Sequence, residues 1–496
     1  MSVSPSGSAH AAAVHFSRRR RALAITVVAI AFVMDLIDST IVNVAIPSIQ
    51  ADLRIPYSAV QWVVAGYTLA FAAILITGGR LGDVYGYKRL FLIGVAGFAA
   101  ASALCGLAWS SPILIVARLL QGAMAAMMVP QIMSLVQVMY EPRERLGVLS
   151  ALGLLGGTAG VLGPVVAGLL TGANLFGLGW RPIFLVNIPC AAFALAAGAW
   201  LLPAGRSTHP LRLDGTGTVL ATGAMLLLVF PLIEGRYFDR SAPIIVMLIA
   251  SAILFAVFAR HARRRMQQDG SPLVVPGLFL DRGFLYGSLI SWLYSAAITG
   301  FMLSYTVMLQ NGLGYSMLHA GLAHAPFAAG AGLTMSVMSR MLTLRLGRYV
   351  LTLGMTLSAI GFASLMVLIS RPESAPLGLW AIGPCVLVAG IGLGLTVSPL
   401  PAFSLASVPL RDAGSASGVM NTATQLGNAI GAALIGTVLF AAMEPPRALV
   451  RAPEVRQLEV TRGFERSNGV VLCLLGAAIL LSLRMPRHLQ NAAKAL

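Results

Sequence analysis

Long apolar runs separated by short polar segments fill most of the chain. Fourteen of these runs are about 20 residues long and apolar on all sides, the length an α-helix needs to cross a bilayer core of about 30 Å. Outer-membrane strands, in contrast, alternate polar and apolar residues over about 10 positions. The pattern therefore predicts an all-α polytopic membrane protein. The predicted spans are 22–46, 60–79, 90–108, 112–134, 147–171, 182–203, 216–233, 243–259, 284–309, 320–338, 350–369, 378–404, 413–441 and 468–485.

Composition and charge agree with this interpretation. Hydrophobic residues make up 57% of the chain and charged residues 10%, whereas soluble domains carry about 25% charged residues. The net charge of +17 raises the question of nucleic acid, but about 23 of the 34 Lys and Arg fall in segments that are cytoplasmic when both termini lie inside. This distribution is the positive-inside pattern. It predicts a multi-pass protein of the cell inner (plasma) membrane with cytoplasmic N- and C-termini, and no nucleic-acid partner.

The spans group as six, two and six. A basic segment, Arg260 to Arg282, reads as a cytoplasmic linker between two membrane halves, and the two spans before it carry few polar residues. Such a layout is typical of duplicated transport halves with an inserted helix pair. The predicted domains are a cytoplasmic tail 1–21, an N-terminal six-helix bundle 22–205, two inserted helices with the linker 206–282, a C-terminal six-helix bundle 283–486, and a cytoplasmic tail 487–496.

Two carboxylates lie in the middle of the first span. Asp35 and Asp38 are three residues apart, so they share a helix face. A charged side chain at this depth costs about 2.5–3.5 kcal/mol on insertion scales. Residues that are retained at such a cost usually face a protein interior or a water-filled path and handle ions or protons. Both are therefore candidates for proton coupling.

A cation inside the fourth span needs a partner. Arg118 lies about six residues into that span and cannot lose its proton, so it must find a carboxylate, carbonyl groups or water. Gln121 follows it at helical spacing. The fifth span contains Gly160, Gly163, Pro164 and Gly168, in which small residues permit close helix contact and the proline interrupts the backbone ladder.

The loop after the second span combines glycines, an acid and cations. Gly79 and Gly86 allow a tight turn, and Asp83 is followed by Lys88 and Arg89, so the loop can form a charge-paired latch on the cytoplasmic rim. Further polar residues in the spans are candidates for lining a substrate cavity, with packing as the alternative for the tyrosines. These candidates are Asn43, Gln121, Tyr294, Tyr305, Asn421 and Gln425.

No metal site or cofactor is expected. His319 and His324 lie about 140° apart on a helix, and the four cysteines are scattered singly through apolar spans.

These motifs together resemble a known family. The loop Gly79 to Arg89 is similar to the G-x-L-x-D-x-x-G-x-[RK]-[RK] signature of the major facilitator superfamily, and Arg118 to Ala126 to its R-x-x-Q-G-x-x-A-A motif. Gly163-Pro164 resembles the antiporter motif of exporters. The segments Leu36 to Pro47 and Trp180 to Pro189 resemble the fourteen-span drug:proton antiporters. In the second half, Thr343 stands where the loop signature has an acid, which leaves one acidic latch in the N-terminal half.

The resemblance implies a secondary active transporter, not an enzyme, which exports small amphipathic or cationic compounds in exchange for protons. It implies two six-helix bundles that rock around a central cavity, with Asp38, together with Asp35, as the proton carrier and Arg118 tuning it. Asp83 would latch the inward-closed state against the start of the thirteenth span, around Gly414. The expected partners are a small-molecule substrate, protons and the lipid bilayer, and a periplasmic adaptor stays open.

Two alternatives stay open at this stage. The first is a transporter of the same fold for a metabolite such as an amino acid, sugar or siderophore. The second is a membrane enzyme or sensor, which would need a catalytic cluster at one rim or a sizeable soluble domain. The seven histidines are dispersed, and the longest loop has about 25 residues, against the 100 or more of a typical domain.

Overall fold

The computed structural model describes residues 17–174, 177–206, 213–234, 242–268, 270–335, 339–370, 378–408, 413–443 and 453–485, and within them it is helical without strands. The helices of the N-terminal part are α1 (Arg18–Leu53), α2 (Tyr57–Tyr85), α3 (Tyr87–Gly106), α4 (Ser111–Met139), α5 (Pro142–Gly172), α6 (Pro182–Leu185), α7 (Asn187–Leu201), α8 (Gly215–Glu234) and α9 (Ala242–Gln268).

The C-terminal part begins with η3 (Pro276–Leu280) and continues with α10 (Arg282–Val307), η4 (Met308–Gly312), α11 (Met317–Ala323), α12 (Ala325–Leu333), α13 (Ser339–Leu346), α14 (Tyr349–Ile369), α15 (Leu379–Val397), α16 (Leu400–Leu405), α17 (Ala413–Met443) and α18 (Pro453–Leu483).

Twelve helical segments within the described residues are long and apolar enough to cross a membrane. The other two predicted spans, 147–171 and 320–338, fall on α5 and on α11 with α12. The predicted all-α membrane fold is confirmed, but three spans predicted as single helices are broken. A proline follows or lies at each break: Pro189 is the third residue of α7, Pro326 is the second residue of α12, and Pro399 lies between α15 and α16. Proline lacks the backbone N–H and clashes with the preceding turn, so each helix restarts there.

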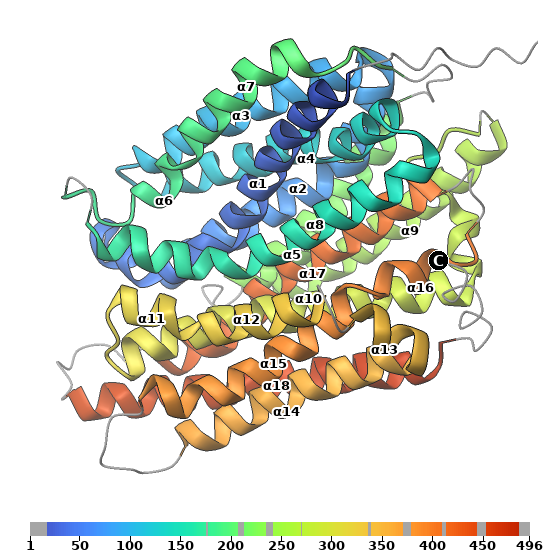
Figure 1. The fold of residues 1–496 in the computed structure, drawn as a ribbon. Coiled ribbons are helices and arrows are strands. Elements are labelled where there is room, and N and C mark those ends of the chain that lie inside the picture. The colour runs from blue at the N-terminus through green and yellow to red at the C-terminus, as the bar shows by residue number, and fades with distance from the viewer. Residues whose placement is uncertain are drawn as a thin grey trace, which may run out of the picture.

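The helices form two groups that lie side by side in Figure 1, one blue to green and the other yellow to red. In the first group, α1 packs on α5 and α7, and α4 packs on α2 and α3. In the second group, α10 packs on α17 and α18, and α14 packs on α15 and α18. The groups meet where α2 contacts α17 and where α5 contacts α11 and α12. We call these two groups the N-terminal half and the C-terminal half.

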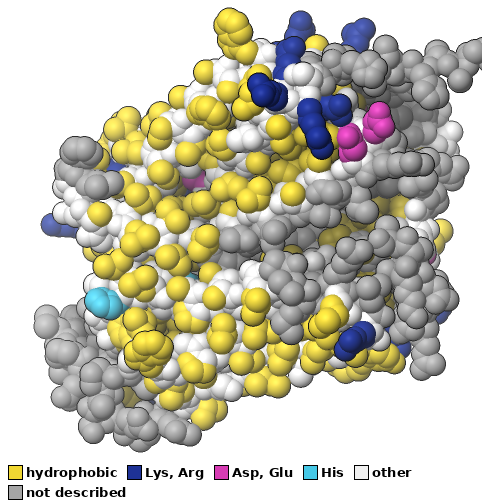
Figure 2. Space-filling view, in the orientation of Figure 1, with side chains coloured by type: hydrophobic (Ala, Val, Ile, Leu, Met, Phe, Trp, Pro, Cys, Tyr) yellow, Lys and Arg dark blue, Asp and Glu magenta, His cyan; other side chains and the backbone are white. Residues whose placement is uncertain are grey.

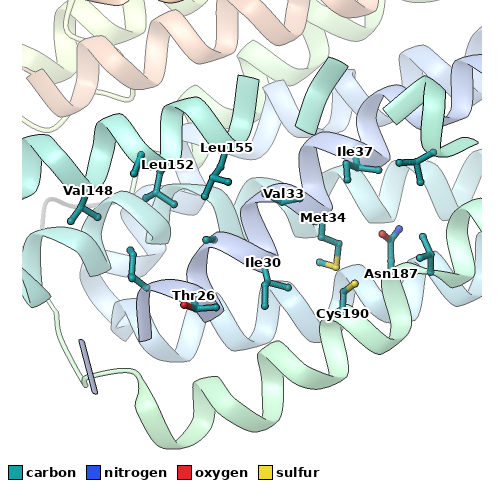
Figure 3. A pocket seen from close by; sticks show the side chains of 15 residues that line it. Thr26, Ile30, Val33, Met34, Ile37, Val148, Leu152, Leu155, Asn187 and Cys190 are labelled. Atoms are coloured by element: carbon teal, nitrogen blue, oxygen red, sulfur yellow. The ribbon is translucent and has the colours of Figure 1, made fainter. Parts of the chain in front are cut away.

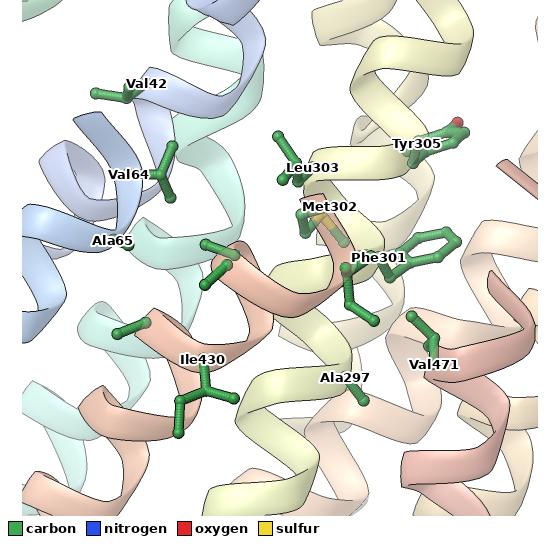
Figure 4. Close-up of a cluster of buried hydrophobic side chains, with 14 of the residues drawn as sticks. Val42, Val64, Ala65, Ala297, Phe301, Met302, Leu303, Tyr305, Ile430 and Val471 are labelled. Carbon is green, nitrogen blue, oxygen red and sulfur yellow. The ribbon is translucent and has the colours of Figure 1, made fainter. Parts of the chain in front are cut away.

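Apolar packing is continuous across the two halves. Figure 4 shows Val42 of α1 and Val64 of α2 on one side, and Met302 of α10 and Ile430 of α17 on the other. All four side chains are less than a tenth exposed and belong to one cluster of buried residues. The seam between the halves is therefore closed by close-packed side chains at this depth.

The helix α8 covers one side of the seam. It contacts α2 of the N-terminal half and α17 of the C-terminal half, with α9 packed against its other side. The Trp62 indole N–H donates to Glu234 at 2.9 Å, and the Thr77 and Thr218 hydroxyls lie 2.7 Å apart. The Thr437 hydroxyl of α17 donates to the carbonyl oxygen of Leu232 at 2.6 Å. The helix α8 thus makes contacts with both halves.

The linker after α9 is anchored on one carboxylate. Asp214 accepts hydrogen bonds from the backbone N–H groups of Gly217 and Leu273, at 2.9 and 3.0 Å, and lies 2.8 Å from the His261 ring nitrogen. Burial acts to raise the pKa of Asp214, but the hydrogen bonds outweigh it and lower that pKa below its ordinary value. The Arg80 guanidinium donates to the Pro272 carbonyl at 2.8 Å, which ties the linker to the end of α2.

The lowered pKa of Asp214 predicts a pH-dependent stability difference between wild type and Asp214→Asn. A group whose pKa is depressed by folding stabilises the protein above its unfolded pKa, and the contribution is lost as the pH falls through the folded value. Hydrogen bonds to a charged group are worth about 1.5–3 kcal/mol, so Asp214→Asn should melt at a lower temperature than wild type at pH 7. The difference in melting temperature between wild type and Asp214→Asn should shrink as the pH falls from 7 to 3, and melting curves in detergent measure it. A difference that stays constant over this range would contradict the prediction.

Close approach of α2 and α4 depends on Gly122. A Cβ atom at this position would lie 2.1 Å from the Tyr67 carbonyl oxygen, whereas a Cβ at Gly66, on the same interface, would lie 3.6 Å from the nearest atoms of Leu119. The first distance is a clash with backbone and the second is ordinary contact. The interface is therefore set by the absence of a side chain at one position.

We expect Gly122→Ala to destabilise the protein by about 1–3 kcal/mol, the usual cost of overpacking a well-packed core. The matched control is Gly66→Ala, which adds the same methyl group to the same interface where there is room. Melting temperatures of the detergent-solubilised variants check this prediction. Equal melting temperatures for the two variants would show that α2 and α4 can move apart at little cost.

Candidate functional site

A buried ion pair joins α1 and α4. The Arg118 Nη1 atom lies 2.7 Å from Asp38 Oδ2, and both side chains are almost completely buried. Arg118 also donates from Nε to the Val63 carbonyl oxygen of α2 at 3.0 Å. The partner that the sequence requires for Arg118 is thus the carboxylate of the first span.

Two amide side chains complete the shell around Asp38. Gln121 Nε2 and Asn187 Nδ2 both donate to Asp38 Oδ1, at 2.8 and 2.6 Å. The Ser102 hydroxyl accepts from the same two amides, at 2.8 and 3.3 Å. Asp38 therefore receives hydrogen bonds from α4 and α7, and a serine of α3 fixes the orientation of both amides.

Helix geometry explains why Arg118 and Gln121 act together. Residues three apart are neighbours on one helix face, and Arg118 Nη1 donates to Gln121 Oε1 at 2.6 Å. Gly122 follows directly and lets the Tyr67 backbone approach α4. The spacing R-x-x-Q-G thus supplies a cation, an amide that orients it, and space for the neighbouring helix.

Asp35 belongs to the same site but has a different partner. The Tyr67 hydroxyl donates to Asp35 Oδ1 at 2.5 Å, and Asp35 is 4% exposed. The Arg118 guanidinium carbon lies 4.3 Å from the centre of the Tyr67 ring, a cation–π arrangement. Tyr67 therefore contacts the second carboxylate with its hydroxyl and the arginine with its ring. We call Asp35, Asp38, Tyr67, Arg118, Gln121 and Asn187 the charge centre.

The charge centre holds two carboxylates and one cation. Asp38 is paired with Arg118 and receives two further amide hydrogen bonds. Among the described residues Asp35 has a single hydrogen-bond donor, the neutral Tyr67 hydroxyl. A buried charge without a partner of opposite sign is costly, so the neutral or cation-bound form of Asp35 is favoured. The geometry thus distinguishes the two carboxylates that the sequence treats as a pair.

The predicted cavity residues of the C-terminal half lie in polar contacts of their own. Asn428 donates to Gln425 at 2.8 Å, and Asn421 is exposed. The hydroxyls of Tyr294 and Tyr305 bond inside the half, to Ser358 at 2.9 Å and to the Ala323 carbonyl at 3.1 Å. In this structure both tyrosines pack within the C-terminal half, and substrate contact for either stays a prediction.

Asn43 of the first span is buried, and its Oδ1 atom has no hydrogen-bond partner. It lies five residues beyond Asp38, towards the C-terminal end of α1. An unsatisfied acceptor is compatible with a polar contact to a substrate. Contact of Asn43 with a substrate also stays a prediction.

The predicted latch is contained in the N-terminal half in this structure. Asp83 accepts a hydrogen bond from the Tyr87 hydroxyl at 3.0 Å, and Lys88 donates to the Ala199 carbonyl at 2.6 Å. Gly86 has a φ of +99°, a conformation that requires glycine, and it separates α2 from α3. Gly79 faces Pro130, and Arg89 is exposed. The surroundings of Gly414, where the latch partner was expected, lie outside the described residues.

The glycines of the antiporter motif make two helix contacts. A Cβ at Gly163 would lie 2.0 Å from the Thr40 hydroxyl of α1. A Cβ at Gly168 would lie 2.9 Å from the Cα atom of Gly321 in α11, so α5 meets the C-terminal half there. Pro164 lies inside α5, and the surroundings of Gly160 lie outside the described residues.

Sequence reasoning missed three members of the site or its support. Tyr67 and Ser102 lie in apolar spans where a tyrosine or serine is usually a packing residue, and Asn187 lies inside a segment noted for its family pattern. The signal that marks Asn187 is an amide two residues before Pro189, at the point where the proline breaks the helix.

The described residues contain no group of three His, Cys, Asp or Glu side chains able to hold a metal. His324 is buried and its ring contacts the Ala320 carbonyl, while His319 contacts Ser316.

Fold and site together define a class: a polytopic helical membrane protein of two halves with a buried charge centre near mid-membrane depth. The model of the Major Facilitator Superfamily matches residues 28–432. The chain therefore belongs to the Major Facilitator Superfamily, a family of transporters, as the motifs of the first spans predict.

Similar proteins are named for antibiotic transport or resistance. The chain is 38% identical over 425 residues to a "Probable actinorhodin transporter" of Streptomyces coelicolor, covering 85% of this chain and 73% of that protein. It is 34% identical to the "Puromycin resistance protein pur8" of Streptomyces alboniger, covering 84% and 82%. It is 32% identical to the "Multidrug resistance protein Stp" of Mycobacterium tuberculosis, covering 85% and 76%.

Solved structures share the fold. A bacterial homologue of the human lysosomal transporter Spinster, in an inward-facing and unoccupied conformation, matches with a TM-score of 0.66 at 15% identity, covering 96% of this chain and 99% of that one. An auto-inhibited POT family peptide transporter matches with a TM-score of 0.65 at 15% identity, covering 94% and 96%.

The buried pair predicts a double-mutant result. Arg118→Gln leaves Asp38 as a buried charge without a cation and should cost about 3–5 kcal/mol of stability. Asp38→Asn combined with Arg118→Gln removes both charges and should recover most of that loss. Melting temperatures of both single variants and the double variant check this. A double variant no more stable than Arg118→Gln would show that the pair is not what stabilises the site.

Proposed function

We propose that the protein exports small amphipathic or cationic compounds across the inner membrane in exchange for protons, by alternating access. The observation that carries the proposal is the charge centre, in which a carboxylate with a single neutral donor, Asp35, lies beside the Asp38–Arg118 pair. The names of the relatives, for actinorhodin, puromycin and multidrug resistance, support antibiotic-like organic compounds as substrates. The positive-inside distribution of Lys and Arg supports cytoplasmic termini.

The two carboxylates have different roles in this mechanism. Asp35 exchanges its proton for a cationic substrate, because one buried negative charge can be neutralised by either but not by both. Asp38 holds Arg118 in place, and Arg118 in turn fixes the ring of Tyr67. The hypothesis from sequence placed coupling on Asp38 first. The hydrogen-bond inventory favours Asp35, since protonating Asp38 would neutralise the carboxylate that pairs with the buried Arg118.

Competition for a single site yields antiport without a separate coupling device. A proton that binds from the outside neutralises Asp35 and disfavours the bound cation. Release of that proton to the inside restores the charge and the affinity for the next substrate. Hydrogen bonds between the halves support an outer closure in this structure: Gln310 donates to the Val44 carbonyl at 2.7 Å, and Gln61 donates to Thr437 at 3.3 Å, both near the predicted outer ends of the helices.

Substrate-induced proton release from purified protein tests this function. Asp35→Asn should fold with an unchanged melting temperature, because the amide oxygen still accepts from Tyr67, but it should release no proton when a cationic substrate is added. Asp38→Asn should lower the melting temperature. The matched control is Asp52→Asn, a half-exposed carboxylate on the same helix that pairs with Arg181, which should release protons as wild type does.

The readouts are a pH-indicator dye in weakly buffered detergent solution and proton-driven uptake of the substrate into inverted vesicles. Normal proton release by Asp35→Asn together with loss in Asp38→Asn would return the coupling role to Asp38. Normal release and normal uptake in both variants would overturn proton antiport through the charge centre.

A further inference from the structure

A cavity of about 560 Å³ lies between α1, α5 and α7, and its walls are almost entirely apolar. Figure 3 shows Ile30 and Val33 of α1, Leu152 and Leu155 of α5, and Cys190 of α7 around it. The helix α1 packs on both α5 and α7 and forms the floor. We call this cavity the α5–α7 crevice.

The crevice opens to the side of the molecule. The residues of α1 that line it, such as Ile25 and Ile30, are partly exposed, whereas the opposite face of α1 is buried against the charge centre. Leu155 on the α5 wall is 46% exposed. Hydrophobic side chains dominate the corresponding face of the molecule in Figure 2. The side of a membrane-spanning helix bundle is bathed in hydrocarbon, so the mouth of the crevice faces lipid.

The length of the crevice corresponds to one leaflet. Its floor runs from Ile25 to Ile37, which at about 1.5 Å per residue is about 18 Å. Half of a hydrocarbon core of about 30 Å is about 15 Å. An extended acyl chain that enters at the end of α1 therefore reaches the inner end of the crevice near the middle of the membrane.

The end of the crevice at the start of α1 carries positive charge. Arg18 and Arg21 lie on the helical stripe of α1 that continues into Ile25. Arg20 donates to the Trp200 carbonyl at 3.0 Å, and Trp200, at the end of α7, is 83% exposed, as an aromatic side chain at the headgroup level usually is.

Two acids lie near these cations, Glu141 at the N-cap of α5 and Glu144 in its first turn. Glu144 of α5 pairs with Arg21 at 3.1 Å, bridging the mouth, while Arg18 and Arg19 are exposed. Figure 2 shows Lys and Arg side chains gathered over the ends of α1 and α7, with two acidic side chains beside them. The net charge at the mouth is positive and lies at the level of lipid headgroups.

We propose that the α5–α7 crevice binds an anionic phospholipid of the cytoplasmic leaflet, with one acyl chain in the crevice and the headgroup on the arginines Arg18 to Arg21. The apolar walls fit the acyl chain and exclude the polar headgroup. The cationic mouth selects an anionic headgroup over a zwitterionic one and disfavours a cationic export substrate. The assignment to the cytoplasmic leaflet rests on the orientation given with the proposed function.

The inner end of the crevice touches the charge centre. Asn187 lines the crevice, is 2% exposed, and donates to Asp38 at 2.6 Å. An acyl chain in place keeps water away from this hydrogen bond and holds α7 against α1. If the proposed function is correct, export therefore depends on the anionic lipid. An empty crevice weakens the hydrogen bond from Asn187 to Asp38.

The test is a titration of purified protein in detergent with phosphatidylglycerol or phosphatidylcholine, followed by native mass spectrometry. Arg18→Gln combined with Arg19→Gln should weaken phosphatidylglycerol binding about 30-fold, because each basic residue near an anionic headgroup is worth about 1 kcal/mol. Phosphatidylcholine binding should change little. The matched control is Arg263→Gln with Arg264→Gln, which removes two exposed cations at the end of α9.

A second pair of variants tests the chain pocket itself. Ala29→Phe fills the crevice from its floor and should reduce binding of both lipids, whereas Ala100→Phe, on an exposed position of α3 outside the crevice, should not. Equal phosphatidylglycerol affinity in the two double-arginine variants would overturn the headgroup site. Reduced substrate binding by Ala29→Phe with unchanged lipid binding would assign the crevice to substrate instead.

These lipid measurements are made without substrate or a proton gradient, so their outcome is independent of antiport. Asp35→Asn should keep wild-type lipid affinity even though it loses proton release. Efflux from liposomes with and without phosphatidylglycerol then tests the link to export: wild type should be faster with the anionic lipid, and Ala29→Phe should be equally slow in both.

Discussion

The ion pair between Asp38 and Arg118 is the constraint around which the N-terminal half is arranged. Neither charge is tolerable alone at this depth, because an isolated buried ion costs several kcal/mol even after relaxation. The pair satisfies both charges only if α1 and α4 keep their relative rotation, and α7 and α2 add an amide and a carbonyl from opposite sides. Gly122 serves the same purpose, since α2 must come close enough for its carbonyls to reach Arg118.

The charges of the charge centre do not balance within it. With two carboxylates and one guanidinium, the centre is one positive charge short of neutrality whenever both carboxylates are ionised. Tyr67 contributes a hydrogen bond to Asp35 but no charge. A proton or a cationic ligand can supply the missing charge. In the proposed function, a single carboxylate three residues from the ion pair thereby becomes the exchange site.

Much of this could be predicted from the sequence. Apolar run length determined the helical spans, and the cost of burying Arg118 and Asp38 required a polar partner for each. What the sequence could not supply was which residues far apart in the chain meet. Asn187 reaches Asp38, and Ser102 reaches the amide of Asn187, only because α7 and α3 pack around α1 and α4. Tyr67 contacts Asp35 with its hydroxyl and Arg118 with its ring. Spacing along one helix carries none of this information.

Tyr294 and Tyr305 show the limit of helix periodicity as a guide to a cavity. Tyr294 and Tyr305 look like cavity residues because aromatic and polar positions mix along their span. In this structure each hydroxyl has a partner inside the C-terminal half, at Ser358 and at the Ala323 carbonyl, because a buried hydroxyl without a hydrogen bond is costly. Contact of either tyrosine with a substrate stays a prediction. Periodicity places a residue on a helix face, but the packing of neighbouring helices decides whether that face meets a cavity or another helix.

The position of the charge centre explains how chemistry within one half can reach the seam between the halves. Asp35 and Asp38 lie on α1 and Tyr67 on α2, and these same helices bond the C-terminal half further out, through Val44 and Gln61. Val44 is six residues from Asp38, about 9 Å along α1, and Gln61 is equally far from Tyr67 along α2. Helices are stiff over such distances. A change of charge that shifts Tyr67 against Asp35 therefore bears directly on the two helices that bond the C-terminal half through Val44 and Gln61.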